Sequence, residues 1–214
     1  MDLIDYLARW GHFLAGITWI GLLYYFNFVQ TEYFKEADGD ARTDAFVKLV
    51  PRALWWFRWG AMFTFLTGLI MLGYRGAGVT VDITVGAVLG TLMFLNVWLI
   101  IWPNQKILIA SNTQVKGGGE ALPEAAAAAP KAALASRTNT LFSIPMLFFM
   151  GSSAHYGHGG LAGNDMALIV ALVIIAALQL NAIVGKPGPM ASVKGVITSG
   201  FALTAVLWAA VALV

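Results

Sequence analysis

Six apolar stretches, separated by polar or glycine-rich connections, dominate this 214-residue sequence. Each is close to the roughly 20 residues that an α-helix needs to cross the hydrocarbon core of a bilayer. Inside lipid the backbone must satisfy its own hydrogen bonds, and the apolar residues show no strand-like alternation. The sequence therefore predicts an all-α integral membrane bundle in the lipid bilayer, with spans at about 6–30, 53–74, 83–109, 138–154, 166–184 and 193–214.

The composition agrees with a single membrane domain over 1–214. Only 11% of the residues are charged, less than half the share of about 25% found in soluble domains. A net charge of +2 is too small to indicate nucleic-acid binding. Without cysteine there is no disulfide, no iron–sulfur cluster and no C-x-x-C-H motif for a c-type haem. The first apolar stretch follows acidic residues, and we interpret it as a retained helix rather than a signal peptide.

Prolines and alanines mark the remaining local features. Pro103 and Pro145 lie inside apolar stretches and predict kinks in two helices. The segment at about 111–135 is low in complexity and rich in alanine. We expect it to be a cytoplasmic loop whose end extends the fourth helix, with a break at Pro130.

Lysine and arginine predict the orientation, because they concentrate in cytoplasmic loops. Ten of them lie in or beside the first, third and fifth connections: Lys35, Arg42, Lys48, Arg52, Lys106, Lys116, Lys131, Arg137, Lys186 and Lys194. The opposite side has only Arg9 near the N-terminus and Arg75 in the second connection. Both termini are therefore expected on the outer side, together with the connection HYGHGG at residues 155–160.

All three histidines of the chain are predicted on that outer side. His12 lies in the first turns of the first helix, and His155 and His158 follow the fourth. An imidazole in a membrane span should face the bundle interior and have a partner. Glycines near His12 allow a flat ligand to approach, and Trp19 offers an apolar wall.

Three interpretations of the histidines remain open. Haem b needs one or two axial imidazoles, an apolar slot and no cysteine, so His12 with either His155 or His158 is a candidate ligand pair. A copper or zinc ion bound by the three histidines is the second candidate. In the third interpretation the histidines lie at the membrane interface and bind no ligand.

A second set of polar residues is predicted near the cytoplasmic surface. It comprises Arg58, Asn104, Gln105, Arg137 and Asn139. Such groups can bind an anionic or amide-rich small molecule through charge-assisted hydrogen bonds. Arginines near helix ends also extend to the headgroups, which is the commoner role. Asn96 lies mid-span and is expected to bond across to another helix, with Gln179 or Asn181 as partner.

Three stretches carry a resemblance to a known family: RWGHFLAGITWIGLLYYFNFVQ (9–30), NVWLIIWPNQK (96–106) and ASRTNTLFSIPMLFFMGSSAHY (135–156). They resemble the membrane domain of the bacterial membrane-bound, cytochrome c-coupled urate hydroxylases, most over the first four helices and least over the last two. The resemblance implies an inner-membrane oxidoreductase with His12 and His155 as haem or redox-site residues. Because the sequence ends after the sixth stretch without C-x-x-C-H, it also implies a stand-alone member.

Two function classes follow from these observations. The first is a membrane redox protein with haem b near the periplasmic face, which passes electrons to a separate acceptor such as a periplasmic cytochrome c and oxidises a purine-like substrate. The second is a non-catalytic accessory subunit that packs against a larger membrane complex or another copy of itself. A visible absorption band that is lost in His12→Ala distinguishes the two.

Overall fold

The computed structural model describes residues 2–213, and within them the chain is all-α, with no strand and one isolated bridge between Thr80 and Gly160. The helices are α1 (Leu3–Tyr24), η1 (Tyr25–Gln30), α2 (Thr31–Glu36), α3 (Gly39–Lys48), α4 (Val50–Arg75), η2 (Gly76–Gly78), α5 (Val81–Leu95), η3 (Asn96–Ile101), α6 (Trp102–Lys116), α7 (Ala125–His155), α8 (Asp165–Val184), η4 (Gly188–Ala191) and α9 (Val193–Leu213). The predicted end of the last span at residue 214 lies outside the described residues.

The chain is a helical membrane protein. Four continuous helical segments of the described residues are long and apolar enough to cross a bilayer: Leu3–Glu36, Val81–Lys116, Asp165–Val184 and Val193–Leu213. The two other long helices are α4, with 26 residues, and α7, with 31. The all-α membrane bundle is thus confirmed, whereas six crossings and the outward position of both termini stay predictions.

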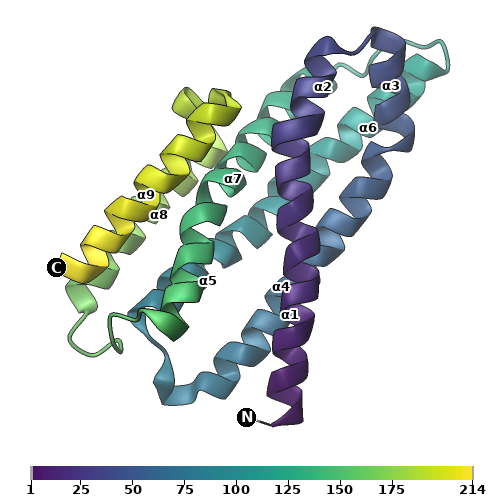
Figure 1. Cartoon of the computed structure of the whole chain (residues 1–214). Helices are drawn as coiled ribbons and strands as arrows, with labels where there is room; N and C mark the ends of the chain where they lie inside the picture. The colour runs from purple at the N-terminus through teal and green to yellow at the C-terminus, as the bar shows by residue number, and fades with distance from the viewer. Residues whose placement is uncertain (1, 214) are drawn as a thin grey trace.

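The long helices pack in two groups (Figure 1). α1 lies along α4, and Gly60 makes this approach possible, because a Cβ there would lie 3.2 Å from the backbone nitrogen of Trp19. α7 packs against α5, α6 and α9, with α8 beside α9. The start of α1, the end of α4 and the end of α7 lie together at what we call the N-terminal end of the bundle.

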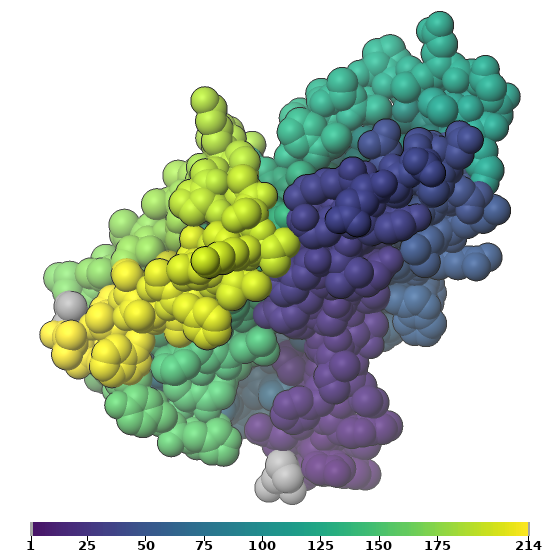
Figure 2. Space-filling model, turned by 45° about the horizontal axis from the view of Figure 1, so that its top comes forward, coloured from purple at the N-terminus to yellow at the C-terminus, as the bar shows by residue number. Residues whose placement is uncertain are grey.

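The opposite end is formed by α2, α3 and the segment that joins α6 to α7, which gather there in the space-filling view (Figure 2). An ion pair connects this end across the chain, since Asp44 of α3 contacts both Lys48 and Lys116. Several cations assigned to the cytoplasmic side therefore lie at this end of the molecule.

Two helices contain a widened turn of π-helix. In the segment from Val81 to Lys116 the π turn η3 ends at Ile101, two residues before Pro103. A proline has no N–H to donate and its ring clashes with the preceding turn, so a wider turn relieves the conflict. The π turn thus lies next to the predicted kink at Pro103, and the kink itself stays a prediction.

The alanine-rich segment differs from the prediction. α6 continues to Lys116 and α7 begins at Ala125, so only residues 117–124 form the connection instead of about 111–135. The expected extension of the fourth helix is present, but the expected break at Pro130 was wrong, because α7 passes through Pro130 without interruption. Pro130 lies in the second turn, where it removes a single backbone hydrogen bond from a run with high helix propensity.

A buried amide network fixes α7 against the neighbouring helices. Asn96, 1% exposed, donates to Asn139 Oδ1 at 2.9 Å and to Gln179 Oε1 at 3.0 Å. Gln179 donates back to Asn96 at 2.7 Å, and Asn139 donates to the Met93 carbonyl at 2.9 Å. Gln179 is therefore the expected partner of Asn96, whereas Asn181 bonds to the backbone of Lys186 instead.

Candidate functional site

A cavity of about 690 Å³ lies between the α1–α4 pair and the α5–α7 pair. Its walls are mostly apolar, and Gly16, Gly68, Gly90 and Gly151 contribute to them from four helices. Along α1 the lining runs from Arg9 to Gly21, a depth of about 18 Å at 1.5 Å per residue. This depth and the small residues provide a slot for a large flat ligand.

His12 lines the cavity from α1, and its ring is oriented by a neighbouring hydroxyl. Nδ1 lies 3.1 Å from Oγ1 of Thr67 on α4. That hydroxyl lies 2.6 Å from the Phe63 carbonyl and 3.0 Å from the Thr64 carbonyl, so its proton is committed to the backbone. The Thr67 oxygen therefore accepts from Nδ1–H, which leaves the lone pair of Nε2 free to bind a ligand.

Gly68 explains how the His12 ring fits against α4. A Cβ at this position would lie 3.3 Å from Cε1 of His12. A larger residue here would crowd the imidazole, so the ring or the helix would have to shift slightly. The pairing of Gly68 with His12 is a feature of the cavity wall that the sequence did not reveal.

His155 and Trp19 also line the cavity. His155 is the last residue of α7 and reaches the cavity from the wall opposite α1. Trp19 is 2% exposed, and its Nε1 has no hydrogen-bond partner among the described residues. The structure thus brings His12, His155 and Trp19 to one cavity.

His158 does not line this cavity. Its backbone N–H donates to Asp82 Oδ2 at 2.8 Å, and its Nδ1 lies 2.8 Å from Asp82 Oδ1. Ser152 donates to the same Oδ1 at 2.8 Å, so Asp82 joins the start of α5 to the end of α7 and the following loop. Within residues 2–213, no group of three His, Asp or Glu side chains lies close enough to hold a metal ion. The interpretation of the three histidines as one copper or zinc site therefore has no support here.

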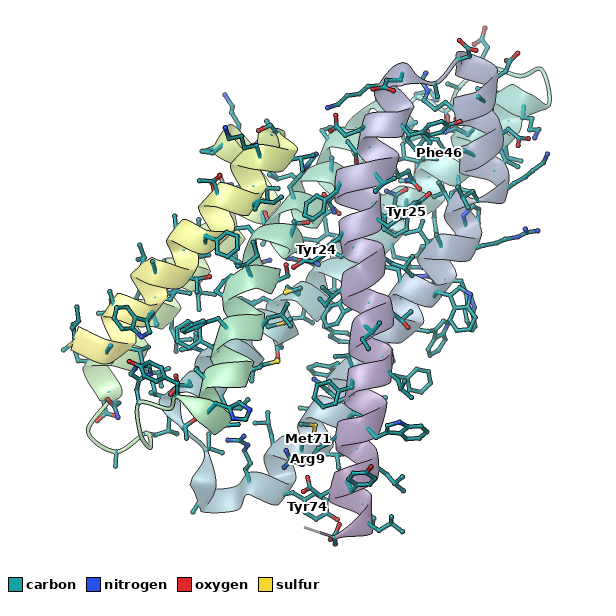
Figure 3. The ribbon with its side chains drawn as sticks, viewed as in Figure 1. Arg9, Tyr24, Tyr25, Phe46, Met71 and Tyr74 are labelled. Atoms are coloured by element: carbon teal, nitrogen blue, oxygen red, sulfur yellow. The ribbon has the colours of Figure 1, made fainter. Side chains whose placement is uncertain are left out.

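Two arginines stand at the N-terminal end of the cavity, and sequence analysis used them only to set the orientation. Arg9 lies one turn before His12, with its Nε at 3.0 Å and 3.1 Å from the two oxygens of Asp5. Arg75 ends α4 and donates from Nη2 to Ser153 Oγ at 3.4 Å. Figure 3 shows Arg9 and Met71 directed from α1 and α4 toward the space between the helix pairs. The i, i+3 spacing of Arg9 and His12 was the available signal, because it places both on one helix face.

The predicted cytoplasmic cluster does not form a hydrogen-bonded unit. The Arg58 guanidinium lies over the ring of Trp102, 3.4 Å from its centroid, and Asn104 donates to the Ile100 carbonyl of its own helix. Asn139 belongs to the amide network of Asn96. No hydrogen bond joins any two of the cluster's members within the described chain; these are Arg58, Asn104, Gln105, Arg137 and Asn139.

Comparison with known families identifies the family of this chain. The model of the urate oxidase N-terminal family matches residues 75–211. The chain belongs to this family. The match includes α8 and most of α9, where the resemblance seen in the sequence was least. It also includes His155 but not His12. No curated protein and no solved structure was found to match the chain.

Proposed function

We propose that this urate oxidase-related membrane protein holds haem b in the cavity between α1–α4 and α5–α7 and acts in electron transfer. The observation that carries the proposal is the meeting of His12 and His155, from opposite walls, in one deep apolar cavity of about 690 Å³. Haem b requires axial imidazoles and an apolar slot, and it needs no cysteine. The two histidines and the apolar lining of the cavity fit that requirement.

His12 is the residue we assign as the principal ligand. Its hydrogen bond to Thr67 fixes the ring and the tautomer, which is the arrangement that ligating histidines usually have. His155 is the candidate second ligand, from the end of α7. The glycines that line the cavity let the helix backbones approach the faces of a macrocycle, and Trp19 closes the deep part against water.

Haem b would supply one-electron chemistry, while the chain supplies its ligands and its apolar surroundings. The cavity begins at the N-terminal end of the bundle, which we expect on the outer side from the distribution of Lys and Arg. We infer that electrons leave on this side to a separate acceptor, such as a periplasmic cytochrome c, in a bacterial inner membrane. Membership of the urate oxidase-related family supports a purine-like substrate for the oxidation.

A haem titration of the purified apoprotein tests the proposal. Protein from haem-deficient cells should bind haem saturably, with a sharpened and shifted Soret band. His12→Ala should lose this change, and His155→Ala should weaken it or alter the ligation. His158→Asn, whose amide can still donate to Asp82, is the matched control and should bind as wild type does. If the wild type shows no saturable binding, or if His12→Ala binds equally well, the proposal fails.

A further inference from the structure

We propose that Arg9 and Arg75 bind the carboxylates of the ligand in the cavity and so fix which edge of the ligand faces the N-terminal end of the bundle. The ligand class is an apolar, flat molecule with carboxylates on one edge. This inference rests on the proposed function, since the two propionates of haem b form such an edge. It adds to the proposed function two binding residues that are not iron ligands, and it specifies the orientation of the ligand in the cavity.

The charge of the lining residues is one-sided. Arg9, His12, Arg75 and His155 are its ionisable members among the described residues, and no Asp or Glu lines the cavity. A bound apolar ligand would remove water from the two arginines, which is costly unless the ligand brings negative charge. The cavity therefore selects a ligand that carries its own carboxylates.

Both guanidiniums have unused donors. Arg9 contacts Asp5 through Nε alone, so its Nη1 and Nη2 groups remain available. Arg75 has no salt bridge within residues 2–213 and makes one long hydrogen bond of 3.4 Å to Ser153. A carboxylate can accept two N–H groups from such a fork, which is the stronger arrangement.

The two arginines lie together at one end of the cavity. Arg9 lies in the second turn of α1 and Arg75 is the last residue of α4, which runs antiparallel to α1. Both stand at the N-terminal end, while Trp19, Thr64 and Met146 line the part farther along the helices. A ligand held by His12 would then present its carboxylates to the two arginines and its apolar edge to the deeper wall.

Haem dimethyl ester, in which both propionates are neutralised, separates this role from ligation of the iron. Wild type and the variants Arg9→Gln and Arg75→Gln are titrated with haem b and with the ester. Each substitution should weaken binding of haem b about 10- to 100-fold, the effect of losing one hydrogen bond to a charged group. Binding of the ester should not change between wild type and variants, which also shows that the variants are folded. Arg75→Lys should recover part of the affinity, and Arg52→Gln, outside the cavity, is the control.

Three results would overturn the proposal. If both glutamine variants bind haem b as wild type does, the arginines do not bind the carboxylates, and the proposed function still stands provided that His12→Ala loses haem. If the variants lose the ester as strongly as haem b, the arginines act on the fold. If wild type binds neither ligand, the proposed function fails together with this inference.

Discussion

Replacement of Asp82 by alanine should destabilise the fold strongly. This carboxylate is 0% exposed and accepts three hydrogen bonds, from Ser152 Oγ, His158 Nδ1 and the His158 backbone N–H, each at 2.8 Å. It also lies in the first turn of α5, where the helix dipole favours a negative charge. Alanine would leave all three donors without this acceptor. Each buried donor that is left unsatisfied costs about 1–3 kcal/mol, so the total loss should be about 3 kcal/mol or more.

Asp82→Asn provides a graded comparison. The amide oxygen can replace Oδ1, which accepts from Ser152 and from the His158 ring, but its NH2 group cannot accept from the His158 backbone. The expected loss is about 1–3 kcal/mol, the cost of one unsatisfied buried donor. Asp165→Ala, an exposed acid in the first turn of α8, is the control and should cost less than about 1 kcal/mol.

The free energies are measured by reversible unfolding in mixed detergent micelles, with hydrogen exchange of the loop at 156–164 as a second observable. Exchange in this loop should rise in the order wild type, Asp82→Asn, Asp82→Ala, because Asp82 ties the loop to α5. The reasoning would be refuted if Asp82→Ala stayed within about 1 kcal/mol of wild type, or if it matched Asp165→Ala.

Three further predictions concern other parts of the molecule. Thr67→Val should free the His12 ring and lower the affinity for haem about tenfold, as measured by titration of the apoprotein with haem. An unchanged affinity would show that the hydrogen bond from His12 to Thr67 has no role. Asn96→Ala should cost about 2 kcal/mol in unfolding free energy, because it removes three interhelical hydrogen bonds. Lys116 and Lys48 hold the pKa of Asp44 below its usual range, so Asp44 favours the folded state above the unfolded pKa and loses this effect as pH falls through the folded one. Asp44→Asn should therefore lower Tm slightly at neutral pH. The difference should begin to shrink near the unfolded pKa of about 4 and vanish only below the lower folded pKa, and it should be absent at any pH if the ion pair does not form.

The lengths of the apolar stretches were enough to predict the all-α membrane fold. A segment in lipid must be long enough to cross the hydrocarbon core and must satisfy its own backbone hydrogen bonds, and a helix does both. Gln179 could be predicted as the partner of Asn96, since a polar side chain in mid-span needs another one at a similar depth. The break at Pro130 was not predicted correctly, because packing and alanine propensity outweighed the loss of one backbone bond.

The candidate site was only partly predictable. His12, His155 and Trp19 could be grouped by their expected depth, and they line one cavity. The position of His158 depends on Asp82, which lies 76 residues away in sequence, and nothing local in HYGHGG reveals that bond. Asn139 was likewise assigned to a surface cluster, although its partners come from helices whose rotation the sequence does not specify.

The reduced-minus-oxidised visible spectrum of the whole protein, purified in detergent from haem-competent cells, tests the central claim most directly. A haem b held by His12 predicts a Soret band and a sharp alpha band in wild type, and the loss of both in His12→Ala. A flat spectrum for folded wild-type protein would contradict the account, as would bands that persist unchanged in His12→Ala.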